Sequence, residues 1–432
     1  MSENGSQSLT VGVGAVRSSV APMGAYARPD EVDLPALRGG WEPWRVLGAA
    51  SELSIALPSA DPTRSQLYAP RGVLLDIGPD GGTRVVAADT GNHRLLVWPS
   101  LPAVDGADSA VVVGQPDATS EGPQAGGRGP ERGLHLPTGL ARAGDLLLVA
   151  DGWNHRVLGF DAALDADDPE PVLVLGQNGF TDVEPNRGGD PDGTSFYWPF
   201  GVLVHDGWLW VADTGNRRVL GWHGVPGVDS PAGRPADVAL GQPTPHDRGE
   251  NRDGPVGPDT FRWPHQVVVT GGVLWVADAG NHRVLGWHLP VDGDRPADLV
   301  IGQAGFTTAS ELPHVPQGPA ALRFPYGLAV AGGGLVVGDT ANNRILAWTP
   351  PPGPQAGGVP AAGAPAQAVL GQESFAGAGE NRWLAVTSDS LCWPYGLGAI
   401  EHADGVPGAD GATAVLAVAD SGNNRVTLWR RP

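Results

Sequence analysis

The sequence contains no lysine, a single cysteine and no long apolar run. All 27 basic residues are arginine, against 47 acidic residues, so the formal net charge is −20. A nucleic-acid-binding protein needs a cationic surface to displace counterions from phosphates, and anionic membranes repel an acidic chain. We therefore expect no nucleic-acid partner and no membrane partner.

The lone Cys392 excludes internal disulfides and any zinc or iron–sulfur site built from several cysteines of one chain. No run of about 18 apolar residues could span a bilayer. The N-terminus lacks the basic region of a signal peptide. Motifs for phosphate loops, zinc proteases, serine hydrolases and dinucleotide sites are also missing. These absences predict a cytoplasmic protein without a cofactor or a bound metal.

Glycine and proline are abundant, with 65 and 42 copies, yet the chain has the material for a core. Hydrophobic residues make up 41% of it and include 15 tryptophans, which disordered chains lack. An ordered protein rich in turns is therefore expected.

Three landmarks recur in fixed order along the chain. The first reads DTGNHRLLVW from Asp89, DGWNHRVLGF from Asp151, DTGNRRVLGW from Asp213, DAGNHRVLGW from Asp278, DTANNRILAW from Asp339 and DSGNNRVTLW from Asp420. The second is an apolar run ending in Gly-Gln, at Gln115, Gln177, Gln242, Gln303 and Gln372. The third is Pro-x-Gly, at Pro70, Pro137, Pro199, Pro325 and Pro394, with a variant at Pro264 where Gln266 replaces the glycine. The first landmark recurs at steps of 62, 62, 65, 61 and 81 residues, so the chain consists of six repeats.

Each repeat contains four short apolar runs of strand length. In the fourth repeat these are 266–270, 273–277, 283–287 and 299–302, separated by turn-forming residues. This pattern predicts an all-β fold, a six-bladed β-propeller of four-stranded antiparallel blades. The last repeat has only three runs, and the missing one is WRVLG from Trp44. We expect this N-terminal strand to complete the last blade and close the ring, because closure removes exposed strand edges.

The predicted domain organisation follows from where the repeats begin. Residues 41–432 form the propeller, and the polar composition of residues 1–40, rich in Gly, Ser and Pro, predicts a disordered tail. A closed ring of this kind is expected to be a monomer.

These motifs resemble the NHL repeat family. Its blade reads Pro-x-Gly, an apolar strand, V-A-D-x-G-N-x-R and a second apolar strand that ends in an aromatic residue. Residues 199–222 match this pattern almost throughout, and GQPDAT from Gly114 is similar to segments of bacterial NHL proteins. The repeat here is about 62 residues, longer than the usual blade. The extra length lies mainly between each Gly-Gln and the next Pro, as in 116–136 and 177–198.

The residues shared by all six repeats predict a structural role. Each aspartate of the first landmark can cap a tight turn, and the following arginine can pair with it or with backbone carbonyls. Six copies indicate a ring of turns rather than one catalytic set: Asp89, Asp151, Asp213, Asp278, Asp339 and Asp420, with Arg94, Arg156, Arg218, Arg283, Arg344 and Arg425. The aromatic residues that close the third runs are expected to fill the space between blades: Trp98, Phe160, Trp222, Trp287, Trp348 and Trp429.

Three histidines, His93, His155 and His282, share one position and could suggest metal ligands. The other repeats carry Arg217, Asn343 and Asn424 there, and the six positions are rotated about the ring. A structural role is therefore favoured.

Function is expected where the repeats differ. Three long loops share a Glu–Asn–Arg element with Glu184 and Arg187, Glu250 and Arg252, and Glu380 and Arg382, whose guanidinium groups suit carboxylate or phosphate. The alternative is that this element folds the loop onto the ring. The residues after each Pro could converge at the axis and form a pocket with Arg71, His265, Tyr326 and Tyr395, and His265–Gln266 is the clear break in the pattern.

Two functions from different classes fit this sequence. The favoured one is a non-catalytic binding or scaffold protein whose long-loop face holds a protein partner or a small ligand. The resemblance adds a metalloenzyme or its assembly machinery as a possible partner, because some bacterial NHL genes lie beside such operons. The alternative is an enzyme at the axial channel mouth, since similar propellers include peptidylglycine amidating lyases and calcium-dependent lactonases.

Overall fold

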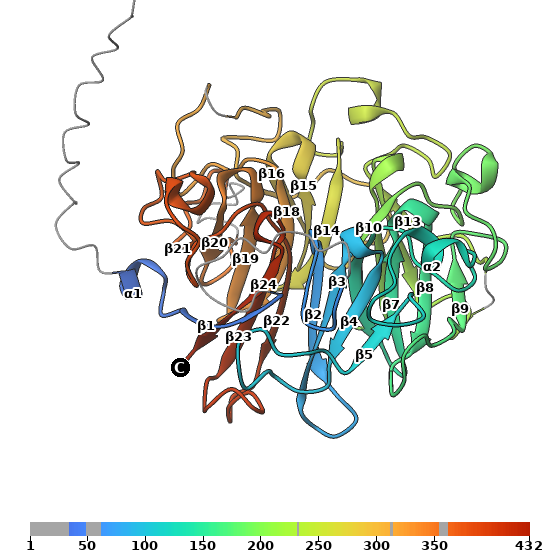
Figure 1. Cartoon of the computed structure of the whole chain (residues 1–432). Helices are drawn as coiled ribbons and strands as arrows, with labels where there is room; N and C mark the ends of the chain where they lie inside the picture. The colour runs from blue at the N-terminus through green and yellow to red at the C-terminus, as the bar shows by residue number, and fades with distance from the viewer. Residues whose placement is uncertain (1–33, 49–61, 231–232, 312–313, 354–361) are drawn as a thin grey trace, which may run out of the picture. The chain divides into compact units, whose positions relative to one another are not determined.

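The computed structural model describes residues 34–48, 62–230, 233–311, 314–353 and 362–432. These residues form six four-stranded antiparallel sheets, each built from strands consecutive in the chain except the last (Figure 1). The predicted all-β, six-bladed propeller is confirmed. No helix of the described residues is long and apolar enough to cross a membrane.

The strand bounds repeat from blade to blade. Blade 1 comprises β2 (Gly72–Ile77), β3 (Thr83–Asp89), β4 (Arg94–Trp98) and β5 (Val111–Val113), and blade 2 comprises β6 (Pro137–Ala143), β7 (Leu146–Asp151), β8 (Arg156–Asp161) and β9 (Leu173–Leu175). Blade 3 comprises β10 (Pro199–His205), β11 (Trp208–Asp213), β12 (Arg218–His223) and β13 (Val238–Leu240), and blade 4 comprises β14 (Pro264–Thr270), β15 (Val273–Asp278), β16 (Arg283–His288) and β17 (Leu299–Ile301). Blade 5 comprises β18 (Pro325–Ala331), β19 (Gly334–Asp339), β20 (Arg344–Trp348) and β21 (Ala368–Leu370), and blade 6 comprises β22 (Pro394–Glu401), β23 (Ala414–Asp420), β24 (Arg425–Arg431) and the N-terminal β1 (Glu42–Leu47).

Helical segments are short and lie between the strands. A single 3-10 turn follows the second strand of each blade: η1 (Thr90–Asn92), η2 (Gly152–Asn154), η4 (Thr214–Asn216), η6 (Ala279–Asn281), η7 (Thr340–Asn342) and η9 (Ser421–Asn423). The long loops between blades carry α2 (Pro123–Gly127), η3 (Pro185–Gly188), η5 (Glu250–Asp253) and η8 (Glu380–Trp383). We call the end of the ring with these turns and long loops the turn face.

The N-terminal strand closes the ring. β1 pairs antiparallel with β24, with Val46 opposite Thr427 and Leu47 opposite Val426 (Figure 1). Before it, α1 (Leu34–Leu37) leads to Arg38, which is buried and pairs with Asp389. The prediction that the N-terminal strand completes the last blade is confirmed. The first 33 residues of the predicted tail lie outside the described residues.

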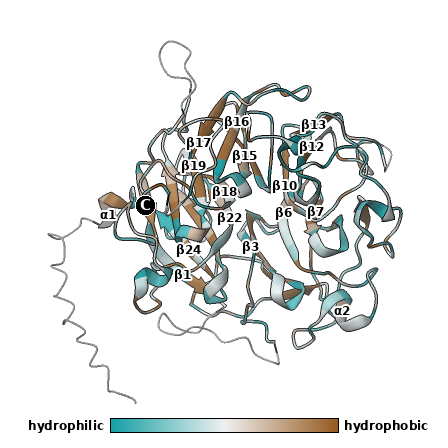
Figure 2. Ribbon diagram, turned by 90° about the horizontal axis from the view of Figure 1, so that it is seen from above, coloured by the Kyte–Doolittle hydropathy of each residue, from teal (hydrophilic) through white to brown (hydrophobic). Residues whose placement is uncertain are grey.

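The hydrophobic core consists of six clusters, one at each junction between blades. Trp222, for example, packs with Val202, Leu220 and residues of blade 2, and Trp287 closes the corresponding cluster between blades 3 and 4. Seen along the axis, the first strands β6, β10, β18 and β22 lie nearest the centre and later strands lie further out (Figure 2). Each blade buries both faces against its neighbours, which accounts for strands that are apolar along their whole length.

Candidate functional site on the turn face

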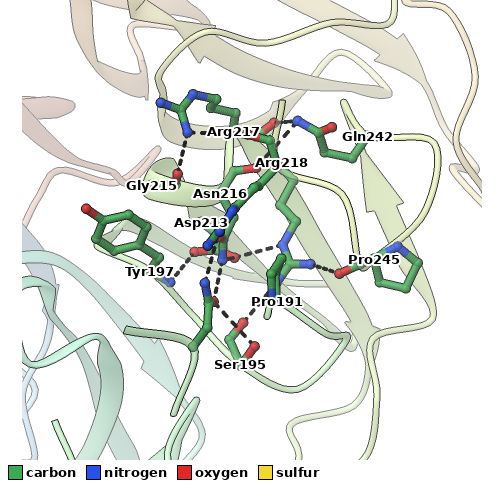
Figure 3. Close-up of polar contacts among 12 residues, drawn as sticks. Pro191, Ser195, Tyr197, Asp213, Gly215, Asn216, Arg217, Arg218, Gln242 and Pro245 are labelled. Atoms are coloured by element: carbon green, nitrogen blue, oxygen red, sulfur yellow. Dashed lines mark hydrogen bonds and ion pairs between the residues drawn. The ribbon is translucent and has the colours of Figure 1, made fainter. Parts of the chain in front are cut away.

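The turn that repeats after each second strand is a buried ionic cluster, and blade 3 shows it clearly (Figure 3). Asp213 accepts hydrogen bonds from Arg218 Nε at 2.8 Å and from Asn216 Nδ2 at 2.8 Å through Oδ2, while its Oδ1 accepts from the Tyr197 backbone N–H at 2.8 Å. Asp213 and Arg218 are fully buried. Burial raises the pKa of Asp213, against the lowering effect of the Arg218 charge.

The arginine of each turn also joins the two loops that flank its blade. Arg218 Nη2 donates to the Asp192 and Ser195 carbonyls of the loop before the blade, at 2.8 and 2.9 Å, and Nη1 donates to Pro245 O in the loop after it. All six arginines form the same ion pair, with N···O distances of 2.7–2.8 Å. In all six, Nε donates to the aspartate and Nη2 donates to backbone carbonyls of the segment before the blade, so each arginine ties its turn to that segment.

The residue after each turn links its blade to the next one. It lies in the left-handed region, with φ 55 for His155, and its side chain accepts a hydrogen bond from the backbone N–H that precedes the next blade's proline. His155 Nδ1 accepts from Trp198 N at 3.1 Å, and Asn343 Oδ1 accepts from Trp393 N at 2.9 Å. We call the five side chains that do this the inter-blade acceptors: His93, His155, His282, Asn343 and Asn424.

The histidines among the inter-blade acceptors must be neutral, because Nδ1 uses its lone pair. Burial lowers the pKa of His93 and of His155 to about 4, and burial also lowers the pKa of His282. Among the described residues, no three His, Cys, Asp or Glu side chains lie close enough together to hold a metal ion. What the structure shows at the shared histidine position is a hydrogen bond to the next blade in all three cases.

The junction between blades 3 and 4 departs from this rule. Arg217 occupies the position of an acceptor but can only donate. The residues before the blade prolines have left-handed φ at the other five junctions, for example φ 52 at Trp198, whereas Trp263 does not. We find no acceptor for the Trp263 N–H among the described residues.

The residues after the blade prolines stack on one another at the axis. The ring centroids of Phe200 and His265 lie 4.4 Å apart, those of His265 and Tyr326 4.3 Å, and those of Tyr326 and Tyr395 4.6 Å. The Arg71 guanidinium lies 5.0 Å from the Tyr395 ring centroid, a cation–π distance. We call these five residues the axial stack. Thr138, from blade 2, donates its hydroxyl to Phe200 O at 3.0 Å.

His265 is held as a neutral ring inside the axial stack. Its side chain is buried at 3% exposure, and Nδ1 lies 2.9 Å from Trp263 O, to which it donates. Burial and the nearby Arg71 charge lower the pKa of His265 to about 3. Burial raises the pKa of Tyr326. A histidine with so low a pKa is a poor general base near neutral pH.

A cavity of about 320 Å³ runs along the first strands behind the axial stack. Arg71, Phe200 and Gln266 line it at the stack end, and Asp76 and Arg142 line it at the other. The axial stack therefore stands at one end of the cavity. Of the sequence-predicted axial residues, Arg71 and Gln266 line the cavity, whereas His265, Tyr326 and Tyr395 do not.

The Pro-x-Gly landmark reflects the close approach of neighbouring first strands. A Cβ built on Gly201 would lie 2.2 Å from His265 O of the next blade, and one on Gly139 would lie 2.2 Å from Phe200 O. No side chain fits at such distances. Gln266 occupies the corresponding position in blade 4, so the junction between blades 4 and 5 leaves room for a side chain.

The three Glu–Asn–Arg loops fold onto the turns of the next blade. Asn186 and Asn216 exchange a pair of amide hydrogen bonds at 3.0 and 2.8 Å. Asn251 with Asn281 and Asn381 with Asn423 do the same.

The arginines of these three loops are occupied by local carboxylates. Arg187 pairs with Asp192, Arg252 with Asp259 and Asp294, and Arg382 with Asp389. Glu250 faces Arg262 at 3.1 Å, and Glu380 accepts from Trp393 Nε1 at 3.2 Å. These contacts hold the three loops against the ring, as the alternative reading of the Glu–Asn–Arg element expects. A ligand role stays a prediction for Glu184, Arg187, Glu250, Arg252, Glu380 and Arg382.

Exposed aromatic side chains on the turn face were not predicted. Tyr68, Trp153, Tyr197, Trp383 and Trp393 are exposed, with 81% exposure at Trp383 and 46% at Trp153. Every one of them lies in a turn-face segment, whereas most exposed large aliphatic residues lie elsewhere. Edge-to-face contacts connect Trp153 to Trp198 and Trp198 to His265, so this surface is continuous with the axial stack. The signal in the sequence is an aromatic residue one or two positions before a blade proline, as at Tyr68, Tyr197 and Trp393.

The protein is thus a β-propeller built from sequence repeats, and each repeat carries a turn with the same Asp, Asn and Arg residues. Residues 261–287, which span the start of blade 4, match the NHL repeat. The chain also matches NHL repeat-containing protein 2 of Bos taurus at 29% identity over 180 residues, which is 39% of this chain and 22% of that protein. One segment of the chain thus matches the NHL repeat, and the predicted resemblance is confirmed.

The chain is also similar to several solved structures at low sequence identity. The chain is similar to a streptogramin B lyase at 10% identity and a TM-score of 0.44, covering 91% of this chain and 98% of that one. It is also similar to an auxiliary nutrient binding protein from Bacteroides thetaiotaomicron VPI-5482 at 10% identity and a TM-score of 0.49, covering 90% of this chain and 76% of that one.

Proposed function

We propose that this protein is a non-catalytic binding module that holds a protein partner on its turn face. The observation that carries the proposal is the segregation of its exposed aromatic side chains. Tyr68, Trp153, Tyr197, Trp383 and Trp393 all belong to this face. Trp and Tyr supply large contact area at small entropic cost and are enriched among residues that dominate protein interfaces.

The chemistry at the axis supports binding over catalysis. His265, the histidine nearest the axis, is stacked between Phe200 and Tyr326 and is neutral with a pKa of about 3. Tyr326 has a raised pKa and keeps its proton. These groups form a rigid aromatic platform and are poorly suited to transfer protons near neutral pH. The enzyme alternative therefore has less support.

Capture from the protein's own cells tests the proposal. The tagged protein is compared with two double variants, Trp153→Ser with Tyr197→Ser and Trp383→Ser with Trp393→Ser, by quantitative mass spectrometry. The matched control is Ile77→Ser with Val104→Ser, which removes exposed apolar side chains away from the turn face. We expect one protein near one-to-one with the wild type and the control, and at least a tenfold loss with a turn-face variant.

Two outcomes would contradict the proposal. One is a partner retained by both turn-face variants, and the other is a partner lost equally with the Ile77 and Val104 control. Circular dichroism melts of all variants separate loss of binding from loss of fold. A metalloenzyme, or a protein of its assembly machinery, is the partner class that we propose first.

A further inference from the structure

The junction between blades 3 and 4 contains a cavity of about 560 Å³ on the turn face. Tyr197, Arg217, His246 and Arg248 line it, together with Glu–Asn–Arg loop residues such as Arg252. It lies where the repeat rule fails, because Arg217 replaces an inter-blade acceptor. A local departure from a rule that the other five junctions keep is typical of a functional site.

Arg217 and Arg248 are cations without carboxylate partners. Among the described residues, the arginines that lack an ion pair are Arg45, Arg71, Arg217, Arg248 and Arg431. Arg45 lies over Trp44, Arg71 lies over Tyr395, and Arg431 donates to Gly332 O. Only Arg217 and Arg248 line one cavity together. Two cations that line one cavity without carboxylate partners favour an anion as the ligand.

The Arg217 guanidinium has donors to spare. Nη1 donates to Gly215 O at 2.9 Å and to Arg248 O at 3.3 Å, while the buried Nε has no partner (Figure 3). Figure 3 places the Arg217 side chain and the Tyr197 ring beside the same turn. Among the described residues Nη2 makes no hydrogen bond and is not one of the buried atoms, so this donor suits a charge-assisted hydrogen bond to an oxyanion.

The acidic residues of the cavity restrict the charge of its ligand. Glu250 faces Arg262, and Arg252 is neutralised by Asp259 and Asp294. Asp247 and Asp253 also line the cavity, and Asp247 accepts hydrogen bonds only from Thr244. Asp247 and Asp253 balance the charges of Arg217 and Arg248, so a ligand with one negative charge meets less repulsion in the cavity than a phosphate dianion does.

We propose that this cavity is a carboxylate-binding site, in which Arg217 and Arg248 receive one carboxylate group. The group belongs to a free small molecule or to a side chain or terminus of a bound protein. This site does not depend on the partner proposed above.

Titration calorimetry with N-acetylglycine tests the site, and its neutral isostere N-acetylglycinamide is the matched ligand control. Arg217→Asn removes the cation and installs the side chain that Asn343 and Asn424 carry at this position, so the fold is preserved. Arg248→Gln removes the second cation, and Arg45→Gln removes an unpaired cation elsewhere. All titrations are made at one ionic strength, because salt screens exposed charges.

We expect saturable binding of N-acetylglycine with a dissociation constant of the order of 1 mM. Binding should weaken at least tenfold in R217N and in R248Q, stay unchanged in R45Q, and be undetectable for the amide. Equal binding of acid and amide, unchanged binding in R217N, or no saturation by the wild type would overturn the proposal. Tighter binding of inorganic phosphate than of N-acetylglycine would overturn the assignment to a carboxylate.

Capture from cells with R217N then identifies the source of the carboxylate. Loss of the partner assigns the group to that protein, whereas an unchanged partner assigns it to a free small molecule. The two proposals fail separately, because the calorimetric result involves no partner and the Trp153 and Trp383 variants leave Arg217 in place.

Discussion

A histidine or an asparagine after five of the six turns carries the link between neighbouring blades. Its left-handed backbone ends the turn, and its side chain accepts a hydrogen bond from the backbone N–H before the next blade's proline, as in His155 and Trp198. Both residue types provide an acceptor at a similar distance from the backbone. Both residue types can therefore make the same hydrogen bond, which explains why some blades have His and others Asn at this position. From the sequence alone, the histidines could also have been metal ligands.

Removing one acceptor should destabilise the ring. His155→Ala leaves the Trp198 N–H without a partner, so we expect a loss of about 1–2 kcal/mol in urea unfolding. His155→Asn should recover at least half of this loss, because Asn343 fills the same role. His205→Ala, on a half-exposed side chain away from the turn face, is the control and should change little. Equal losses for the Ala and Asn variants would argue against the hydrogen bond.

The inter-blade acceptors also predict how stability depends on pH. The pKa of His93 and of His155 is about 4 in the folded protein, below the ordinary value of 6.5. The unfolded chain therefore binds protons first as the pH falls, so stability is complete above pH 6.5 and declines toward pH 4. Unfolding measured across this window should show a smaller decline for His93→Asn with His155→Asn than for the wild type. Parallel curves would contradict this prediction.

At the scale of the element, the first strand of each blade is shaped by its neighbour. Gly201 lies where a Cβ would meet His265 O at 2.2 Å, so Gly201→Ala should force the two strands apart. We expect a loss of about 1–3 kcal/mol, typical of overpacking. Gly293→Ala is the control, because nothing lies within 4 Å of its Cβ position. Gln266→Gly should be tolerated, and a loss there as large as at Gly201 would contradict this account.

Strand and turn positions could be predicted from the sequence because they are local. The apolar runs in the sequence predict the strand bounds of blade 4 to within about two residues. The number of runs per repeat predicts that the strand around Trp44 completes the last blade. For the axial stack, the sequence predicts only that the residues after the blade prolines meet near the axis. Its closed packing could not be predicted, because the ring contacts join residues that are more than 60 positions apart, such as Phe200 and His265. Nor could the lack of a carboxylate partner for Arg217 be predicted, because it depends on how the loop that carries Arg248 packs against this turn.

At the scale of the whole molecule, the junction between blades 6 and 1 is packed like the other five only because β1 completes blade 6. Leu47 of β1 is fully buried in the cluster between blades 6 and 1. Leu47→Ala should cost about 2–5 kcal/mol of unfolding free energy. It should also speed amide exchange in β24, the partner strand. Val104→Ala, at an exposed position, is the control. Unchanged exchange in β24 would show that β1 does not hold the ring closed.

The chain's charge and its aromatic face act together at this scale. A net charge of −20 repels other acidic surfaces, while the turn face offers aromatic side chains and two unpaired arginines. Such a surface favours a partner that brings apolar side chains and a carboxylate together. The opposite end of the ring offers isolated aliphatic side chains and no comparable group of exposed aromatics among the described residues.

Amide exchange of the captured complex tests the central claim, that the turn face is the binding face, most directly. We predict slower exchange on complex formation in η2, η8 and the segments that precede β10 and β22. The hairpins around Gly207 and Gly272, which join first and second strands away from the turn face, should exchange as in the free protein. Protection of those hairpins, with the turn-face segments unchanged, would contradict the account.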